Sequence, residues 1–206
     1  MSINTIAGTV LFQMQRYVAG AFIGVSAVTI FFIPFSLASK GHALVNSANE
    51  VLYPYSSASR QPDELRKVYL GMLGTTAITS AIGATVLILF ADPILRFWVG
   101  PDIAAHGASL LKILAIGFFF LAITPPPFHL FNGLGKPLLN TGFALFNAGA
   151  NVVLLLAFFL INDKLDLVHL AWAFTLANAL NAVGYHVLAE RLVWTQIHRR
   201  VQSLGS

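Results

Sequence analysis

The sequence predicts an all-α integral membrane protein, a bundle of about six transmembrane helices. The first observation is composition, since 57% of the residues are hydrophobic and only 10% are charged. A soluble domain usually carries about 25% charged residues. The second is the mean hydropathy of +0.76. A chain with so few charged residues cannot form a water-soluble surface, so its surface must face lipid.

The third observation is the regular succession of apolar segments along the chain. A membrane-spanning helix needs about 20 mostly apolar residues. Segments of this length lie near residues 3–22, 26–52, 66–90, 105–131, 138–161 and 166–190. The connections between them are short, which favours antiparallel neighbours in a single membrane lobe over residues 1–206. Residues 191–206 are basic and are predicted to form a cytoplasmic tail.

Several function classes are excluded or disfavoured by the residue types present. The chain has no cysteine, so it forms no disulfide and no thiolate metal site. Its formal net charge of +4 comes from residues spread between the apolar segments, where they set topology and do not predict nucleic-acid binding. No nucleophile–base pair or cluster of metal ligands stands out, so we expect neither an enzyme nor a cofactor or metal.

The first segment carries a charge where hydrocarbon is expected. Thr5, Thr9, Gln13, Arg16 and Gly20 recur at spacings of three and four, so they share one helix face. A charged side chain at membrane depth costs a few kcal/mol and is tolerated mainly beside a polar cavity or a partner. Arg16 therefore either faces such a cavity or extends to the nearer membrane surface.

The second segment carries another cation and is kinked at Pro34. Its polar face is predicted to hold Ser36, Lys40, Ala43, Ser47 and Glu50, with Asn46 and Asn49 at its sides. Lys40 and Glu50 are separated by roughly 15 Å along a helix, so they cannot pair directly. Lys40 needs a neighbouring helix, water or a ligand anion, and a structural interhelical ion pair is the alternative. Glu50 lies near the helix end and can also be interfacial.

Small and polar residues form regular stripes on the later segments. The third segment has a small-residue stripe, read as a packing surface for another helix: Gly71, Thr75, Thr79 and Gly83. The fifth and sixth have polar stripes that predict hydrogen bonds between helices: Asn140, Asn147 and Asn151, then Thr175, Asn178, Asn181 and Tyr185.

Three consecutive prolines, Pro125–Pro127, interrupt the fourth segment. They remove backbone donors, and such breaks occur in membranes where the backbone faces protein or a cavity. His129 follows the break. A lone histidine there is more often hydrogen-bonded packing than a proton carrier, and it is also a candidate for lining the cavity.

The distribution of basic residues in alternate loops predicts the orientation. One side would hold Arg60, Arg66, Lys67, Lys136, Arg191, Arg199 and Arg200, and the other Arg96, Lys112 and Lys164. The richer side is predicted to be cytoplasmic. An even number of spans then puts the N-terminus in the cytoplasm as well as the C-terminus.

Five stretches in order resemble the second half of bacterial polysaccharide flippases. They are "QMQRYVAGAFIGVSAVTIFFIPFSLASK", "VLYPYSS", "DELRKVYLGML", "FADPILRFWVG" and "LLKILAIGFFFLAITPPPFHLFNGLGKP". These flippases are the O-antigen and lipid-linked oligosaccharide exporters of the multidrug/oligosaccharidyl-lipid/polysaccharide superfamily. The resemblance covers nearly the whole chain. It implies the C-terminal lobe, family helices seven to twelve, of a two-lobe transporter with a cationic central cavity.

The resemblance also implies a substrate and a site. Undecaprenyl-pyrophosphate-linked sugar repeat units would cross the bacterial inner membrane, with Arg16 and Lys40 meeting the pyrophosphate. Gln13, Ser36, Asn46, Ser47, Glu50 and His129 are the further candidates for lining the cavity. The family often has an acidic residue before the arginine, whereas this chain has Gln15. A single lobe encloses no cavity, so a second lobe or a second copy of the chain is the expected partner, together with the bilayer.

Two alternatives remain open at the level of sequence. A cation-coupled multidrug exporter lobe of the same superfamily would favour membrane acids, and only Glu50 is placed at depth. A non-transporting truncated membrane fragment is the other alternative.

Overall fold

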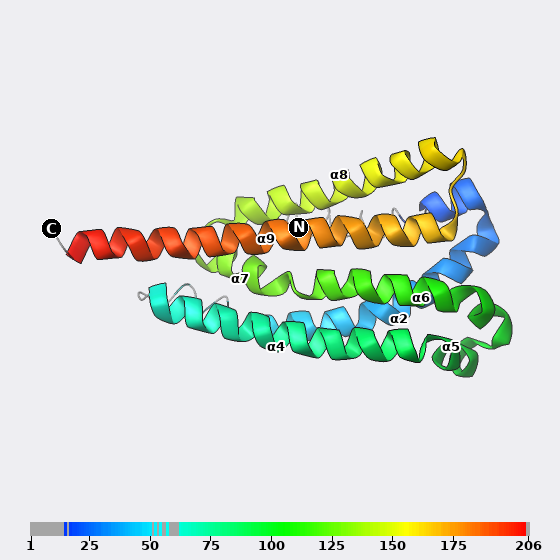
Figure 1. Cartoon of the computed structure of the whole chain (residues 1–206), viewed down its shortest axis with the longest axis horizontal. Helices are drawn as coiled ribbons and strands as arrows, with labels where there is room; N and C mark the ends of the chain where they lie inside the picture. Colours follow the sequence, from blue (N-terminus) through cyan, green and yellow to red (C-terminus); the bar gives the residue numbers. More distant parts are fainter. Residues whose placement is uncertain are drawn as a thin grey trace.

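The computed structural model describes residues 17–50 and 62–204, together with Gln15, Leu52, Pro54 and Ser57. The described chain is helical and contains no strand. A π-helix, η1 (Ala19–Ile23), precedes α2 (Val25–Asn49). The others are α4 (Pro62–Leu89), α5 (Ala91–Val99), α6 (Pro101–Ala122), α7 (Pro125–Gly133), α8 (Pro137–Asn162) and α9 (Leu167–Leu204). The long helices run side by side along one axis (Figure 1).

Prolines and glycines define where these helices begin and end. Pro62, Pro101, Pro125 and Pro137 each stand at a helix start, where the missing N–H costs nothing. Gly24 and Gly100 have φ of +127° and +93°, a backbone conformation that residues with a Cβ rarely adopt. The chain therefore turns sharply between η1 and α2, and between α5 and α6.

The proline run breaks the fourth predicted segment, as the sequence indicates. α6 ends at Ala122 and α7 begins at Pro125. The Thr124 hydroxyl donates to the Leu121 carbonyl at 2.7 Å, and so does the Thr124 N–H at 3.2 Å. The Leu121 carbonyl at the break is thus hydrogen-bonded by a residue close to it in the chain. All three prolines are buried inside the bundle.

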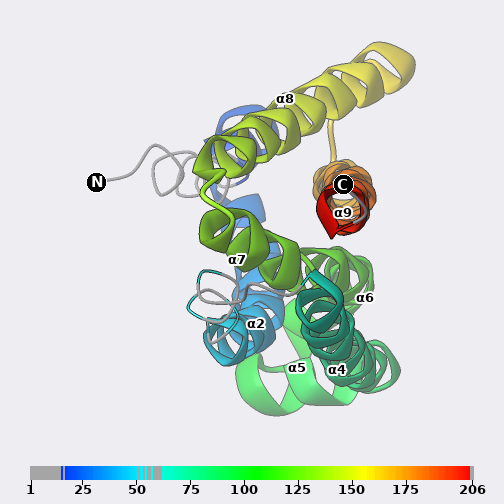
Figure 2. The same cartoon turned by 90° about the vertical axis from the view of Figure 1, so that its left-hand side faces the viewer.

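The core is organised around α6, which packs against α2, α4, α5 and α9 (Figure 2). Phe35, Phe118 and Phe174 come from α2, α6 and α9, and their ring centroids are 5.0–5.2 Å apart. Aromatic pairs at such separations add to the energy of apolar burial. Gly117 of α6 packs closely against α9, since a Cβ there would be 2.7 Å from Thr175 Oγ1.

Polar side chains of α8 and α9 are buried and bonded between helices. Asn147 Nδ2 donates to Asn178 Oδ1 at 3.2 Å, and the Tyr185 hydroxyl donates to Asn140 Oδ1 at 3.2 Å. The Thr175 hydroxyl donates to the Ile113 carbonyl of α6 at 3.0 Å. The predicted interhelical hydrogen bonds are therefore confirmed for these residues of the two polar stripes, whereas the Oδ1 atom of Asn181 has no partner among the described residues.

The small-residue stripe of α4 has a different environment from the one expected. Gly71, Thr75, Thr79 and Gly83 are exposed. A Cβ added at Gly71 or Gly83 would have no neighbour within 4 Å. Thr75 and Thr79 donate to carbonyls of their own helix. The expectation of close helix packing on this stripe is wrong for the described chain, because spacing identifies a shared face without showing what covers it.

The outer surface of the bundle is apolar, as the fold class requires. Leu145, Val153, Leu156 and Leu160 of α8 are among its exposed large hydrophobic residues. Four helical stretches in the described part are long and apolar enough to span a membrane: Asp63–Leu89, Pro101–Gly133, Pro137–Asn162 and Leu167–Val193. The apolar stretch of α2, Ser26–Lys40, is shorter. The protein is a multi-pass membrane protein, and the predicted all-α membrane bundle is confirmed.

The segment after the last predicted span continues as helix. α9 extends without a break as far as Leu204, through most of residues 191–206. Its location on the cytoplasmic side stays a prediction.

Candidate functional site

α2 lies at the edge of the bundle (Figure 2). One of its faces carries polar and charged side chains. Lys40, Ala43, Ser47 and Glu50 are exposed, and Ser36 and Asn46 are half-buried. Their spacing of three and four residues places Ser36, Lys40, Ala43, Ser47 and Glu50 on one side of the helix. The opposite side carries Phe31, Phe35 and Ala38 into the core. The α2 polar face is defined here as Ser36, Lys40, Ala43, Asn46, Ser47 and Glu50.

Lys40 is the cation of the α2 polar face. Its side chain is exposed, and within residues 17–50 and 62–204 it forms no ion pair with a carboxylate. The interhelical pair considered from the sequence is therefore absent from the described chain. Its ammonium group, with three donors, remains available to an anion.

Two of the predicted site residues lie outside the described residues, namely Gln13 and Arg16. Their role stays a prediction.

The fold brings Glu50 and His129 to the same pocket, although 79 positions separate them in the sequence. This pocket has a volume of about 510 Å³ and lies where the end of α2 meets α7 and the start of α8. Its lining residues are Glu50, Phe128, His129, Asn132 and Pro137. One anionic and two polar side chains thus line a space large enough for a small ligand.

His129 is buried, with 8% of its surface exposed, and its ring meets Phe128 edge-on at 5.3 Å. Its Nε2 atom has no hydrogen-bond partner among the described residues. Buried polar atoms are normally bonded, and an exception calls for a bound group or water. His129 therefore packs inside the bundle, with one buried ring nitrogen that is unpaired among the described residues.

Asn132 is a pocket residue that the sequence did not single out. It lies one helical turn after His129 on α7, a spacing that places both on one side of the helix. Its Oδ1 accepts a hydrogen bond from Asn140 Nδ2 at 2.9 Å. Asn140 in turn donates to the Phe128 carbonyl at 3.0 Å, so α8 holds α7 at the edge of the pocket.

Gln15 replaces the acidic residue expected from the resemblance, and it is almost completely buried, with 1% of its surface exposed. Its Nε2 donates to Asn151 Oδ1 of α8 at 3.0 Å, while its Oε1 has no partner among the described residues. A neutral amide pair therefore occupies this interior position. We conclude that the side chain at position 15 brings no charge to the interior of the bundle.

We expect Asn151→Ala to lower the free energy of unfolding by about 1–3 kcal/mol, because it leaves the buried Gln15 amide donor unpaired. The double variant Gln15→Leu/Asn151→Leu should recover most of this loss, since neither partner then needs a hydrogen bond. Thermal unfolding in detergent measures both variants. Equal losses in the single and the double variant would contradict the pairing.

No group of three or more His, Cys, Asp or Glu residues in the described part of the chain is arranged to hold a metal ion. The charges of the α2 polar face are instead separated, with the Lys40 ammonium near the middle and the Glu50 carboxylate at the C-terminal end. Such a face can attract an anion at one position and a cation at the other.

The same arrangement of helices occurs in about half of a known transporter. An inward-facing multidrug resistance MATE family transporter of the MOP superfamily matches 95% of this chain with a TM-score of 0.83, at 13% identity. An outward-facing structure matches 95% with a TM-score of 0.82, at 14% identity. The chain covers 46% and 44% of those chains. The fold is thus that of roughly one half of a membrane transporter.

The chain belongs to the MatE family, whose family model matches residues 15–156. A putative O-antigen transporter from Shigella flexneri is 21% identical over 192 residues, which are 93% of this chain and 45% of that protein. The chain therefore spans about half the length of these relatives. Its family and structural neighbours are transporters.

Proposed function

We propose that this chain forms one lobe of a transporter that moves lipid-linked oligosaccharide across the bacterial inner membrane. The substrate class is a polyprenyl-pyrophosphate glycan, such as an O-antigen or exopolysaccharide repeat unit. The proposal rests on the exposed Lys40 ammonium, which forms no ion pair with a carboxylate of the described residues. A diphosphate is the complementary ligand, since ammonium groups bind phosphate as point charges.

Arg16 is proposed as the second cation at the pyrophosphate, and Gln13, Ser36, Asn46 and Ser47 as polar groups around the glycan. Ser47 donates its hydroxyl proton to the Ala43 carbonyl at 3.3 Å, which leaves its oxygen lone pairs available to sugar hydroxyls. The polyprenyl tail would stay in the lipid.

The second lobe is proposed to be a separate half or another copy of this chain, facing the α2 polar face. The two lobes would rock around the site between inward-open and outward-open states. The nearly equal TM-scores of 0.83 and 0.82 against inward- and outward-facing transporters support this picture, since one lobe fold fits both states. Both termini are proposed to be cytoplasmic.

The proposal is tested in bacteria that lack their own O-antigen transporter. The assembled transporter containing this chain is expressed there, and lipopolysaccharide with attached O-antigen is measured on gels. We expect surface glycan to be restored and drug susceptibility to stay unchanged. Unrestored glycan together with lower drug susceptibility would overturn the glycan substrate.

A second candidate is a cation-coupled multidrug exporter lobe, and the pocket that contains Glu50 and His129 favours it. Acidic residues in membrane transporters hold coupling ions or cationic substrates. The solved transporters with this fold are described as multidrug resistance transporters, which also supports it.

We expect Glu50→Gln to keep most of the glycan export, because a diphosphate substrate needs no anion at this position. Asp163→Asn, on the exposed turn after α8, is the matched control for removing one carboxylate. Surface glycan and drug susceptibility are measured together. Loss of most export in Glu50→Gln alone would favour the cation-coupled exporter.

A further inference from the structure

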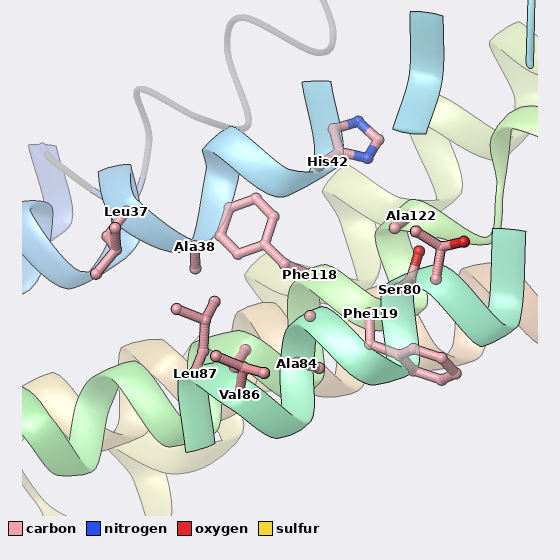
Figure 3. A pocket seen from close by; sticks show the side chains of 13 residues that line it. Leu37, Ala38, His42, Ser80, Ala84, Val86, Leu87, Phe118, Phe119 and Ala122 are labelled. Carbon is pink, nitrogen blue, oxygen red and sulfur yellow. The ribbon is translucent and has the colours of Figure 1, made fainter. Parts of the chain in front are cut away.

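A second cavity lies on the opposite side of α2 from Lys40. Its volume is about 410 Å³, and α2, α4 and α6 form its walls (Figure 3). Most of the lining is apolar and includes Leu37, Val86, Leu87 and Phe118. Its size is within the range of small-molecule sites, which are clefts of about 300–1,000 Å³.

Two of the residues that line this cavity each have a buried polar atom without a hydrogen-bond partner among the described residues, namely His42 Nδ1 and Ser80 Oγ. Ser80 has only 9% of its surface exposed. Both side chains lie toward one end of the cavity, whereas Leu37, Val86 and Leu87 lie toward the other (Figure 3). The cavity is therefore polar at one end and apolar at the other. An unpaired buried polar group costs free energy, which a ligand with a matching group recovers.

The depth of the polar end argues for a small molecule over a phospholipid. Ser80 lies nine residues before Leu89, the last residue of α4. This separation is about 14 Å at a rise of 1.5 Å per residue, close to the middle of a hydrocarbon core about 30 Å thick. A phospholipid keeps its headgroup at the interface, so its acyl chain would leave both polar atoms unpaired. A compact amphiphile can carry a hydrogen-bonding group to this depth.

We propose that the cavity between α2, α4 and α6 binds a small amphiphile, an apolar body that carries one hydrogen-bonding group. The apolar body lies against Leu37, Val86 and Leu87. The polar group bonds to Ser80, which can donate or accept, and to the ring nitrogen of His42. This inference does not depend on the glycan substrate, because the cavity and the α2 polar face lie on different sides of α2.

Gly83 offers a way to fill the cavity without disturbing the fold. It lines the cavity, and a Cβ added there meets no atom within 4 Å. Leucine is also a better helix former than glycine. Gly71→Leu is the matched control, since Gly71 is an exposed α4 glycine with the same open space and does not line the cavity.

The probe is 1-aminoanthracene, a planar apolar amine that fluoresces more strongly in apolar sites, added to the chain in nanodiscs with empty nanodiscs as blank. We expect saturable binding that Gly83→Leu weakens at least about tenfold and that Gly71→Leu leaves unchanged. Ser80→Ala should weaken binding by roughly three- to tenfold without lowering thermal stability, because it removes an unpaired hydroxyl.

The photoreactive analogue 1-azidoanthracene gives an independent readout. Mass spectrometry should find the label on peptides of α2, α4 or α6, and Gly83→Leu should abolish it. Absence of saturable binding, equal affinity in the two leucine variants, or labelling only on other helices would each overturn the proposal.

Discussion

Lys40→Glu is expected to reduce glycan export by about tenfold to a hundredfold. Hydrogen bonds to charged groups contribute about 1.5–3 kcal/mol, and the reversed charge adds repulsion toward the diphosphate. The side chain at this position is exposed and carries no ion pair with a described carboxylate. Folding should therefore be preserved while transport is lost. Surface glycan at equal protein levels in the membrane is the measurement.

Two controls separate a specific site from a general charge effect. Lys40→Arg keeps the positive charge and should retain most of the export. Lys164→Glu makes the same charge change at an exposed position between α8 and α9, away from the α2 polar face, and should export normally. Normal export by Lys40→Glu would contradict the assignment of Lys40 to the pyrophosphate.

Gly117→Leu is expected to have the largest effect on stability. A Cβ there would lie 2.7 Å from Thr175 Oγ1 and 2.9–3.0 Å from two ring atoms of Phe174. The new side chain must separate α6 from α9 and disturb the hydrogen bond from Thr175 to Ile113. Overpacking and the lost bond together predict a loss of about 2–4 kcal/mol in the free energy of unfolding.

Gly149→Leu is the matched control, since Gly149 is an exposed glycine of α8 whose added Cβ meets nothing within 4 Å. Thermal unfolding and size-exclusion profiles in detergent should show an unstable or aggregated Gly117→Leu protein beside a normal Gly149→Leu protein. Equal melting temperatures would contradict close packing of α6 on α9.

The sequence predicted the membrane class and the interruption of the fourth segment because both depend on local chemistry. Low charge excludes a water-facing surface, and Pro125–Pro127 cannot donate backbone hydrogen bonds. The spacing of Asn140, Asn147 and Asn151 also identified a buried face correctly. Each of these inferences needs only neighbours along the chain.

The partners across the bundle could not be predicted in this way. Gln15 bonds to Asn151 across 136 positions, and Glu50 shares a pocket with His129 across 79. Helical periodicity orders residues around one axis and contains no information about which helix lies opposite. For the same reason the spacing of the glycine and threonine stripe of α4 predicts helix packing, although the stripe is exposed in the described chain.

The cavity between α2, α4 and α6 has a consequence for how its ligand can affect transport. It lies within the described helices of this chain, and the fold of the chain matches inward- and outward-facing transporters with TM-scores of 0.83 and 0.82. If the chain moves as one rigid lobe, as proposed above, we expect the ligand to bind the inward- and outward-open states with the same affinity. A ligand with equal affinity for two states does not shift their populations, however tightly it binds. Such a ligand would stay bound in both states and would not change the ratio of inward-open to outward-open protein.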